Sequence, residues 1–182
     1  MNEVELNKKE KLSPHFTMGE LTKTSYHTLD GNIPSHVAIE NLKRICGWLE
    51  ILRERYNRKY GGGGVTREGQ APLCPSSRAQ TNASPCVSLD IPVVINSGYR
   101  SEEINQKCGG AKGSNHLTGC AVDIKCLGPE QMIRYACLLL DTADENRWVF
   151  DELIQEKRGT TYWIHFAVRP KDNRRKILFD CR

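Results

Sequence analysis

The sequence has no run of apolar residues long enough to cross a membrane, which takes about 20 consecutive residues. It also has little excess of one charge, because 26 Lys and Arg residues against 22 Asp and Glu leave a net charge of +4. This excess is too weak to indicate a nucleic-acid-binding protein, although it favours contact with an anionic surface. The first residues, MNEVELNKKEKL, alternate charges and contain no apolar segment, so we expect no secretory signal peptide here.

The eight cysteines include no C-x-x-C pair, so neither a zinc ribbon nor a thioredoxin-like site is indicated. Cys74 and Cys86 flank the loop-like stretch PSSRAQTNASP and are candidates for a disulfide that closes it. Cys46 lies in an apolar helical pattern and is predicted to be an ordinary buried thiol. The sequence does not choose among the other possible pairings.

The composition is that of a globular protein, with 38% hydrophobic and 26% charged residues in a chain of 182 residues. This length fits one domain with a substantial core, so we predict a single domain over residues 1–182. Residues 61–90 begin with GGGG and continue as a polar stretch rich in Pro and Ser, without periodicity. We interpret them as a loop inserted at the surface of that domain. The basic stretch RPKDNRRK (169–176) is interpreted as a solvated tail.

Helical periodicity is strongest over residues 33–60, where apolar residues recur largely at i, i+3 and i+4 after a Pro-Ser pair. Thr17 and Glu20 have the spacing of a capping box, which predicts a short helix after them. An amphipathic helix is predicted over residues 129–143, with a proline at its start. Residues 101–110 predict one or two further helical turns.

Several short β-branched or apolar runs predict strands. These strands are expected at residues 91–99, 120–126, 148–156, 161–168 and 176–180, the last at an edge. The KRGT turn, with Gly159, should join two of them into a hairpin. Because helices come first and strands follow with one helix between them, the predicted fold is α+β, a mostly antiparallel sheet flanked by helices.

The stretch SNHLTGCAVDIKC places His116 seven residues before Asp123. Each residue also has a structural interpretation, as a loop-capping imidazole or as a carboxylate bonded to backbone amides. His165, in the aromatic strand WIHF, is on its own more typical of a hydrogen-bonded core histidine. Together the three form a set that binds zinc tetrahedrally and leaves a fourth position for water, as in catalytic sites. Cys120 and Cys126 lie three residues either side of Asp123, so in a regular strand they point to the opposite face.

Three segments in this order, SGYRSEEIN, GGAKGSNHLTGCAVDI and WIHFAV, resemble the zinc D-alanyl-D-alanine carboxypeptidase family. That family includes cell-wall dipeptidases, phage endolysins and murein peptidases, and it shares its core with the hedgehog signalling domain. The similarity covers roughly residues 12–168, and its specific part is the pattern S-x-H-x-x-G-x-A-x-D. The resemblance implies a hedgehog/DD-peptidase-like fold with a Zn²⁺ ion held by His116, Asp123 and His165.

The same motifs suggest further roles. The resemblance implies that Arg100, in SGYR, points its guanidinium at the substrate or at the tetrahedral intermediate. Within these motifs, Tyr99 and Ser114 are predicted to contact the substrate. Gly119 and Ala121 are expected to leave room for backbone and substrate beside the metal ion.

The sequence departs from the family pattern at one position. Many members carry a catalytic Glu or Asp three residues before the second histidine, where this chain has Tyr162. A tyrosine with a pKa near 10 is a poor base at neutral pH, although its hydroxyl can donate to an oxyanion. Glu156 is the predicted replacement, because the hairpin would place it opposite Tyr162 or Trp163, within reach across the strands. In a register that turns it away, Glu156 is a solvated residue; Asp151 and Glu152 are expected to lie further from the metal.

These observations predict a zinc metallopeptidase that hydrolyses an amide bond in peptidoglycan stem peptides, as a D-Ala-D-Ala carboxypeptidase or a murein endopeptidase. The alternative is a catalytically impaired, zinc-stabilised module that binds the cell wall or another partner. A third hypothesis is a disulfide-rich extracellular interaction domain without metal. We expect a monomer that acts at the bacterial cell wall on the stem peptide, not on nucleic acid, and that is phage-encoded or exported by another route.

Overall fold

The computed structural model describes residues 6–61 and 90–181 of the chain. Its longest helix, α2 (His36–Tyr60), confirms the helical periodicity predicted over residues 33–60. Ser35 caps this helix, because its side chain accepts a hydrogen bond from a backbone amide of the first turn. The helix therefore begins at the Pro-Ser pair, as the sequence indicates.

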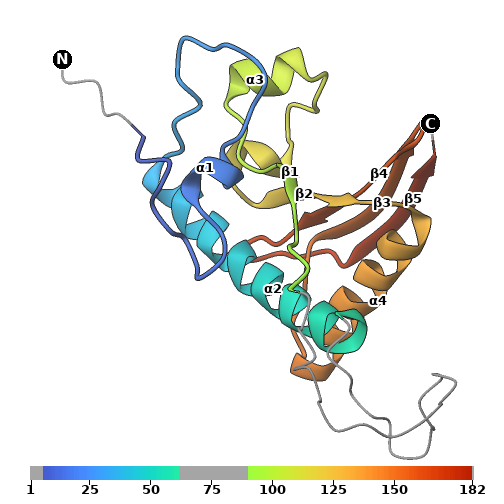
Figure 1. The fold of residues 1–182 in the computed structure, drawn as a ribbon. Helices are drawn as coiled ribbons and strands as arrows, with labels where there is room; N and C mark the ends of the chain where they lie inside the picture. Colours follow the sequence, from blue (N-terminus) through green and yellow to red (C-terminus); the bar gives the residue numbers. More distant parts are fainter. Residues whose placement is uncertain (1–5, 62–89, 182) are drawn as a thin grey trace, which may run out of the picture.

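Helix α4 (Pro129–Asn146) is the second long helix and extends past the predicted end at residue 143. It packs beside α2 under the sheet (Figure 1). The remaining helical elements are short: α1 (Met18–Leu21), α3 (Glu102–Lys107) and the 3-10 turn η1 (Asn115–Thr118). The capping box predicted before α1 is present, with Thr17 and Glu20 each bonded to the other's backbone amide.

Five strands form one sheet in the order β1-β2-β4-β3-β5. Their bounds are β1 (Ile95–Ser97), β2 (Ala121–Cys126), β3 (Glu152–Arg158), β4 (Thr161–Ala167) and β5 (Lys176–Cys181). Every neighbouring pair is antiparallel except β3 and β5, which run parallel. A mostly antiparallel sheet with helices packed on it confirms the α+β prediction.

The two faces of the sheet have different environments. On the inner face, alternate side chains are buried in one apolar core with α2 and α4: Val122, Ile124, Leu153, Ile164 and Phe166. Full burial of a side chain of this size contributes about 1.5–3 kcal/mol. Because side chains alternate along a strand, the residues between them point to the other face. That outer face carries Asp123, His165 and Glu156.

The β3–β4 hairpin forms as predicted, with Gly159 in the left-handed conformation at its turn (φ 58°). In its register Ile154 pairs with His165 and Glu156 pairs with Trp163. This is one of the two registers that the sequence allowed for Glu156. The Glu156 side chain therefore lies on the same face of the sheet as His165.

Two strands are shorter than predicted. Within residues 91–99, only β1 forms a strand, and its pairing with β2 is irregular. The strand expected from residue 148 begins only at Glu152. The reason lies in the preceding helix, which ends later than predicted and is closed by Arg147 in a left-handed conformation (φ 55°). Trp148 and Val149 therefore belong to the turn after α4, where both side chains are partly exposed.

Most of the predicted insertion at 61–90 lies outside the described residues, and so does the proposed Cys74–Cys86 disulfide. The six cysteines of the described ranges are free, and Cys46 is buried as predicted. Among the helices of those ranges, none combines the length and apolar character needed to cross a membrane.

Candidate metal centre

Three side chains from three different elements converge on the outer face of the sheet. His116 comes from η1, Asp123 from β2 and His165 from the neighbouring strand β4, where the last two are directly paired. Their nearest ligand atoms all lie within 4.8 Å of one another. His116 and Asp123 are buried, and the His165 side chain is 12% exposed. The cluster is therefore largely buried, and only small parts of the Asp123 and His165 side chains contact solvent.

The spacing of the ligand atoms suits a zinc ion. His116 Nε2 lies 3.2 Å from His165 Nδ1 and 3.3 Å from Asp123 Oδ1, and the last two atoms lie 3.1 Å apart. Tetrahedral zinc with ligand distances of about 2.0–2.1 Å separates its ligand atoms by about 3.3–3.4 Å. The three atoms thus approximate one face of such a tetrahedron. Two imidazoles and one carboxylate are also the donor types that catalytic zinc sites use.

The local structure of η1 aims His116 at the cluster. Ser114 caps this turn, because its Oγ accepts a hydrogen bond from the His116 amide at 3.3 Å. The ring Nδ1 lies 2.6 Å from the Gly98 carbonyl oxygen and donates to it, which leaves the Nε2 lone pair for a metal ion. Burial lowers the pKa of His116, although Asp123 opposes the change. The neutral, metal-binding form is therefore favoured at this position.

Gly119 has a different function from the expected one. It ends η1 in a left-handed conformation (φ 69°). A Cβ atom added there would lie 2.5 Å from the Ala38 carbonyl oxygen of α2. The glycine therefore permits close packing of the His116 turn on α2. The space beside Gly119, predicted to accommodate backbone and substrate, is occupied by the backbone of a helix.

Asp123 is held from both sides. Its Oδ1 faces the two imidazoles, and its Oδ2 accepts a hydrogen bond from Arg100 Nη2. Arg100 also donates through Nε to Ser97 Oγ at 2.8 Å. Burial would raise the pKa of Asp123, but the two histidines outweigh it and hold the pKa well below its usual range. Asp123 is consequently ionised, as a metal ligand has to be.

His165 contacts a carboxylate on each of its two nitrogens. Nδ1 faces Asp123, while Nε2 lies 3.5 Å from Glu152 Oε2. Burial would lower the pKa of His165, but the hydrogen bonds to Asp123 and Glu152 outweigh it and raise the pKa to about 9. The hydrogen bond from His165 in turn lowers the pKa of Glu152 to about 2. At neutral pH the metal-free imidazole is therefore protonated on both nitrogens, and metal binding has to release the proton on Nδ1.

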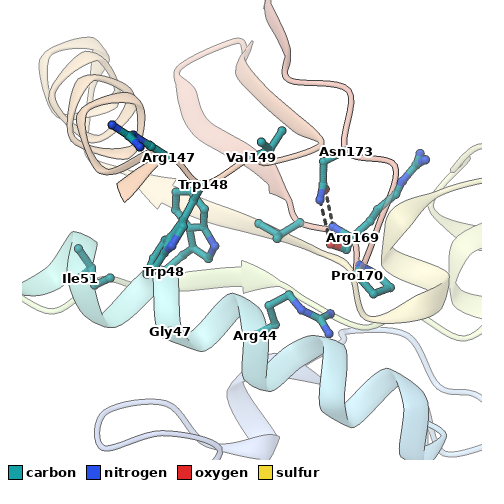
Figure 2. Close-up of a pocket in the computed structure, with 11 residues that line it drawn as sticks. Arg44, Gly47, Trp48, Ile51, Arg147, Trp148, Val149, Arg169, Pro170 and Asn173 are labelled. Carbon is teal, nitrogen blue, oxygen red and sulfur yellow. Dashed lines mark hydrogen bonds between the residues drawn. The ribbon is translucent and has the colours of Figure 1, made fainter. Parts of the chain in front are cut away.

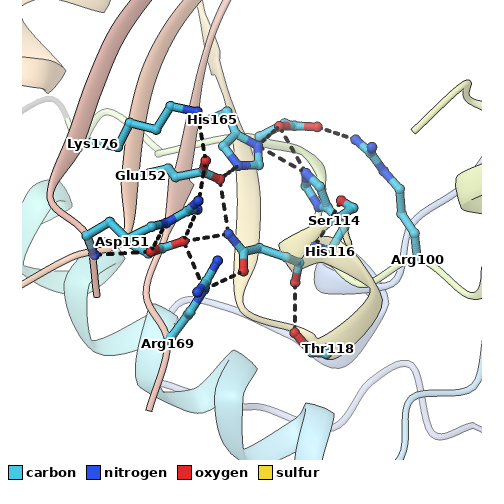
Figure 3. A network of polar contacts seen from close by, with 12 residues as sticks. Arg100, Ser114, His116, Thr118, Asp151, Glu152, His165, Arg169 and Lys176 are labelled. Carbon is cyan, nitrogen blue, oxygen red and sulfur yellow. Dashed lines mark hydrogen bonds and ion pairs between the residues drawn. The ribbon is translucent and has the colours of Figure 1, made fainter. Parts of the chain in front are cut away.

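A network of charged groups extends from Glu152 into the fold. Asn115 donates through Nδ2 to Glu152 Oε2 at 3.0 Å and to Asp151 Oδ2 at 2.8 Å. Asp151 is completely buried and accepts two hydrogen bonds from the Arg174 guanidinium, at 2.8 and 2.7 Å. Arg169 Nε lies 3.0 Å from the same carboxylate. Figure 3 shows Arg100 on one side of the imidazoles and Glu152 and Asp151 on the other.

This network corrects two predictions. The stretch 169–176 is not simply a solvated tail, because Arg169 and Arg174 pair with a buried aspartate. Glu152 was expected to lie further from the metal, yet its carboxylate directly contacts His165. Neither feature has a local sequence signal, because both depend on the β3–β5 pairing and on the turn that follows β4.

Glu156 lies on the ligand face, two residues along β3 from the residue paired with His165. Burial raises the pKa of its carboxyl, and the nearby charge of Asp123 raises it further, while His165 and Trp163 oppose the rise. These effects place Glu156 within the electrostatic field of the cluster. A raised pKa suits a group that exchanges protons near neutral pH.

Tyr162, at the position of the acid that many family members have, points to the opposite face. It pairs with Cys126 and packs against the apolar core, partly buried. Because side chains alternate along a strand, a residue three positions from His165 points to the other face. The hypothesis that its hydroxyl donates to an oxyanion is therefore wrong.

The two predicted substrate contacts have structural partners. The Ser114 hydroxyl caps η1, as described above. The Tyr99 side chain packs against the apolar core, and its backbone amide donates to the Leu21 carbonyl oxygen at 2.7 Å. Its carbonyl oxygen accepts a hydrogen bond from Asn32 at 3.2 Å. Both residues thus help to hold the segments that carry His116 and Arg100.

A groove of about 590 Å³ lies elsewhere, between α2, the turn after α4 and the segment after β4 (Figure 2). Trp48 and Trp148 line it, with ring centroids 5.2 Å apart in an edge-to-face arrangement. Its lining includes none of the predicted metal, catalytic or substrate-contacting residues. No local pattern in the sequence indicates this groove.

The comparison with known families agrees with the geometry. Residues 84–154 match the family model described as Peptidase M15. This segment contains Arg100, His116 and Asp123, whereas His165 lies beyond its end. No curated protein matches the chain. Members of the M15 family are typically metal-dependent, which agrees with the His-Asp-His cluster in this chain.

Proposed function

We propose that the chain is a zinc metallopeptidase that hydrolyses an amide bond in peptidoglycan stem peptides. It would act as a D-Ala-D-Ala carboxypeptidase or a murein endopeptidase, on a single hedgehog/DD-peptidase-like domain spanning residues 1–182. One observation carries the proposal: three ligand atoms at the spacing of a zinc tetrahedron share a sheet face with an acid of raised pKa. The resemblance of the S-x-H-x-x-G-x-A-x-D pattern supports the substrate class.

In this proposal zinc is held by His116 Nε2, Asp123 Oδ1 and His165 Nδ1, the atoms that face one another. When bound, zinc lowers the pKa of a water molecule to about 7 and polarises the carbonyl that is attacked. The protein supplies the fixed geometry, because each ligand is held by a partner outside the set. These partners are the Gly98 carbonyl for His116, Arg100 for Asp123 and Glu152 for His165.

Glu156 is the proposed general base and acid. Burial and the charge of Asp123 raise the pKa of its carboxyl, so it can take a proton from the attacking water and return it to the leaving amine. Lys125, Trp163 and Glu156 form one cross-strand row on the ligand face, next to the row of Asp123 and His165. Neighbouring rows of this kind are about 7 Å apart along the strand, within reach of a bound water and a glutamate side chain.

Arg100 has two proposed roles. Its Nη2 fixes Asp123 Oδ2, so that Oδ1 is directed at the metal position. The guanidinium carries five N–H donors, more than its bonds to Asp123 and Ser97 use. The remaining donors can bind the developing oxyanion or a substrate carboxylate, and a preorganised donor of this kind contributes on the order of 3 kcal/mol. Tyr99 and Ser114, which precede Arg100 and His116 closely in the chain, remain proposed substrate contacts.

The proposal is tested by incubating purified bacterial cell walls with the wild type, His116→Ala and Glu156→Gln. Soluble fragments and new termini are measured by mass spectrometry, which separates loss of terminal D-alanine from cleavage of cross-links. The wild type should release products. Both variants should be at least about a hundredfold slower, because a general base usually contributes about that much or more to the rate. Glu54→Gln, at an exposed glutamate of α2, is the matched control.

The outcomes separate the candidate functions. Full activity of Glu156→Gln would reject its assignment as base. If the wild type binds zinc and cell walls but releases no fragments from several wall types, the zinc-stabilised binding module replaces the peptidase. A wild type that binds no zinc would reject both.

A further inference from the structure

The carboxylate of Glu152 bridges the two segments that carry the histidines. Its Oε2 lies 3.5 Å from His165 Nε2 on β4. The same oxygen accepts a hydrogen bond from Asn115 Nδ2 at 3.0 Å. Asn115 immediately precedes His116 in η1, so one oxygen atom joins both histidine-bearing segments.

Both partners in this bridge have further polar contacts. The other oxygen of Glu152 forms an ion pair with Arg174 Nη2 at 2.9 Å and accepts a hydrogen bond from Lys176 Nζ at 3.4 Å, and the side chain is only 14% exposed. Asn115 is buried, donates to Asp151 at 2.8 Å and accepts from Arg169 Nε at 3.0 Å. The bridge is therefore part of a larger polar network that includes the buried Asp151 (Figure 3).

The direction of the His165 ring gives this bridge a chemical consequence. Nδ1 faces His116 and Asp123, so Nδ1 is the atom available to a metal ion. A neutral imidazole that binds metal through Nδ1 carries its proton on Nε2. The Glu152 carboxylate lies on the Nε2 side, with Oε2 3.5 Å from Nε2, so its negative charge favours the tautomer that carries the proton on Nε2.

We propose that Glu152 is a positioning residue of the metal centre: together with Asn115 it holds His165 with its proton on Nε2 and fixes β4 against η1. Its contribution is to zinc affinity. The inference rests on the proposed function for the identity of the metal ion and not for the substrate. The competing explanation is that Glu152 serves only as an ion-pair partner for Arg174 and Lys176.

The test measures zinc dissociation constants by competition with a chromophoric chelator, at one pH and with the full chain. Glu152→Gln retains the size of the side chain but removes the charge, and Glu152→Asp retains the charge but withdraws it by one methylene. Each should weaken zinc binding about 10- to 100-fold, the usual effect of removing a carboxylate that holds a metal-bound histidine. Lys176→Gln removes a cation from Glu152 without touching His165 and should bind zinc within twofold of the wild type.

Circular dichroism and thermal unfolding of the metal-free proteins establish which variants fold, and the absorption spectrum of the cobalt-loaded site reports its ligand geometry. A folded Glu152 variant that loses less than fivefold in zinc affinity would overturn the inference. So would an equal loss in Lys176→Gln, which would assign the effect to the ion pairs. If the Glu152 variants lose affinity while the wild type cleaves no cell wall, this inference holds and the peptidase proposal fails. A wild type that binds no zinc would overturn both.

Discussion

Asp151 provides the sharpest test of the buried charge network. This carboxylate is completely buried, and it accepts hydrogen bonds from Arg174 at 2.7 and 2.8 Å and from Asn115 at 2.8 Å. Asp151→Asn removes the charge but little volume. It leaves two arginines facing a neutral amide, so we expect the folded state to be destabilised.

The magnitude follows from the pKa of the carboxyl group. Burial would raise this pKa, but the hydrogen bonds from Arg174 and Asn115 outweigh it and lower the pKa from 3.8 to about 2. At 1.36 kcal/mol per pKa unit, the ionised form contributes about 2 kcal/mol to stability at neutral pH. Because the pKa is lowered in the folded state, this contribution is complete above the unfolded pKa. It is lost as the pH falls from about 4.5 to about 2.

Urea unfolding of the wild type and Asp151→Asn at pH 7 and pH 3 measures both quantities. The variant should be about 2 kcal/mol less stable at pH 7, or about 4–8 °C lower in Tm for a chain of this size. The deficit should shrink to about 1 kcal/mol at pH 3. Asp144→Asn, at an exposed pair with Arg175, is the control and should cost less than about 1 kcal/mol. A deficit below about 0.5 kcal/mol at pH 7, or one that does not change with pH, would refute the reasoning.

Three further predictions concern the fold around the site. Gly119→Ala should destabilise the protein by roughly 1–3 kcal/mol in thermal unfolding and weaken zinc binding, because the new Cβ would clash with α2 and the backbone at this position is left-handed. Gly113→Ala is the control and should have neither effect, because nothing lies within 4 Å of its new Cβ. Leu49→Ala, in the core with 0% exposure, should cost about 2–5 kcal/mol in urea unfolding, and a cost near that of the 69% exposed Val37→Ala would contradict the packing. Alkylation of the native protein followed by mass spectrometry should distinguish exposed from buried thiols, and rapid labelling of Cys46, whose pKa burial raises to about 12, would disprove its location. The exposed thiols expected to react are Cys108, Cys137 and Cys181.

Local signals in the sequence predicted most elements of the fold. Amphipathic periodicity identified α2 and α4, and the capping box identified α1. Alternation and a glycine turn predicted the β3–β4 hairpin. The errors fall at ends of elements, as where α4 continues through residue 146 and delays the start of β3. An element's end depends on how the chain turns against its neighbours, which a local pattern does not record.

The ligand set is similarly divided between sequence and structure. The types and order of His116, Asp123 and His165 were readable in the chain. The predicted hairpin left two registers for Glu156, and the structure decided that it shares the face of the ligands. The position of Tyr162 against the core also follows from strand alternation, because Tyr162 and His165 are an odd number of residues apart.

The sequence by itself determined which side chains are available for metal chemistry and which local elements carry them. Only the tertiary structure decided what holds those side chains in place: Gly119 packed on α2, Arg100 bonded to Asp123, and Glu152 placed between His165 and Asn115. The physical reason is that these contacts join residues far apart in the chain, so they form only when sheet pairing and helix packing bring the segments together.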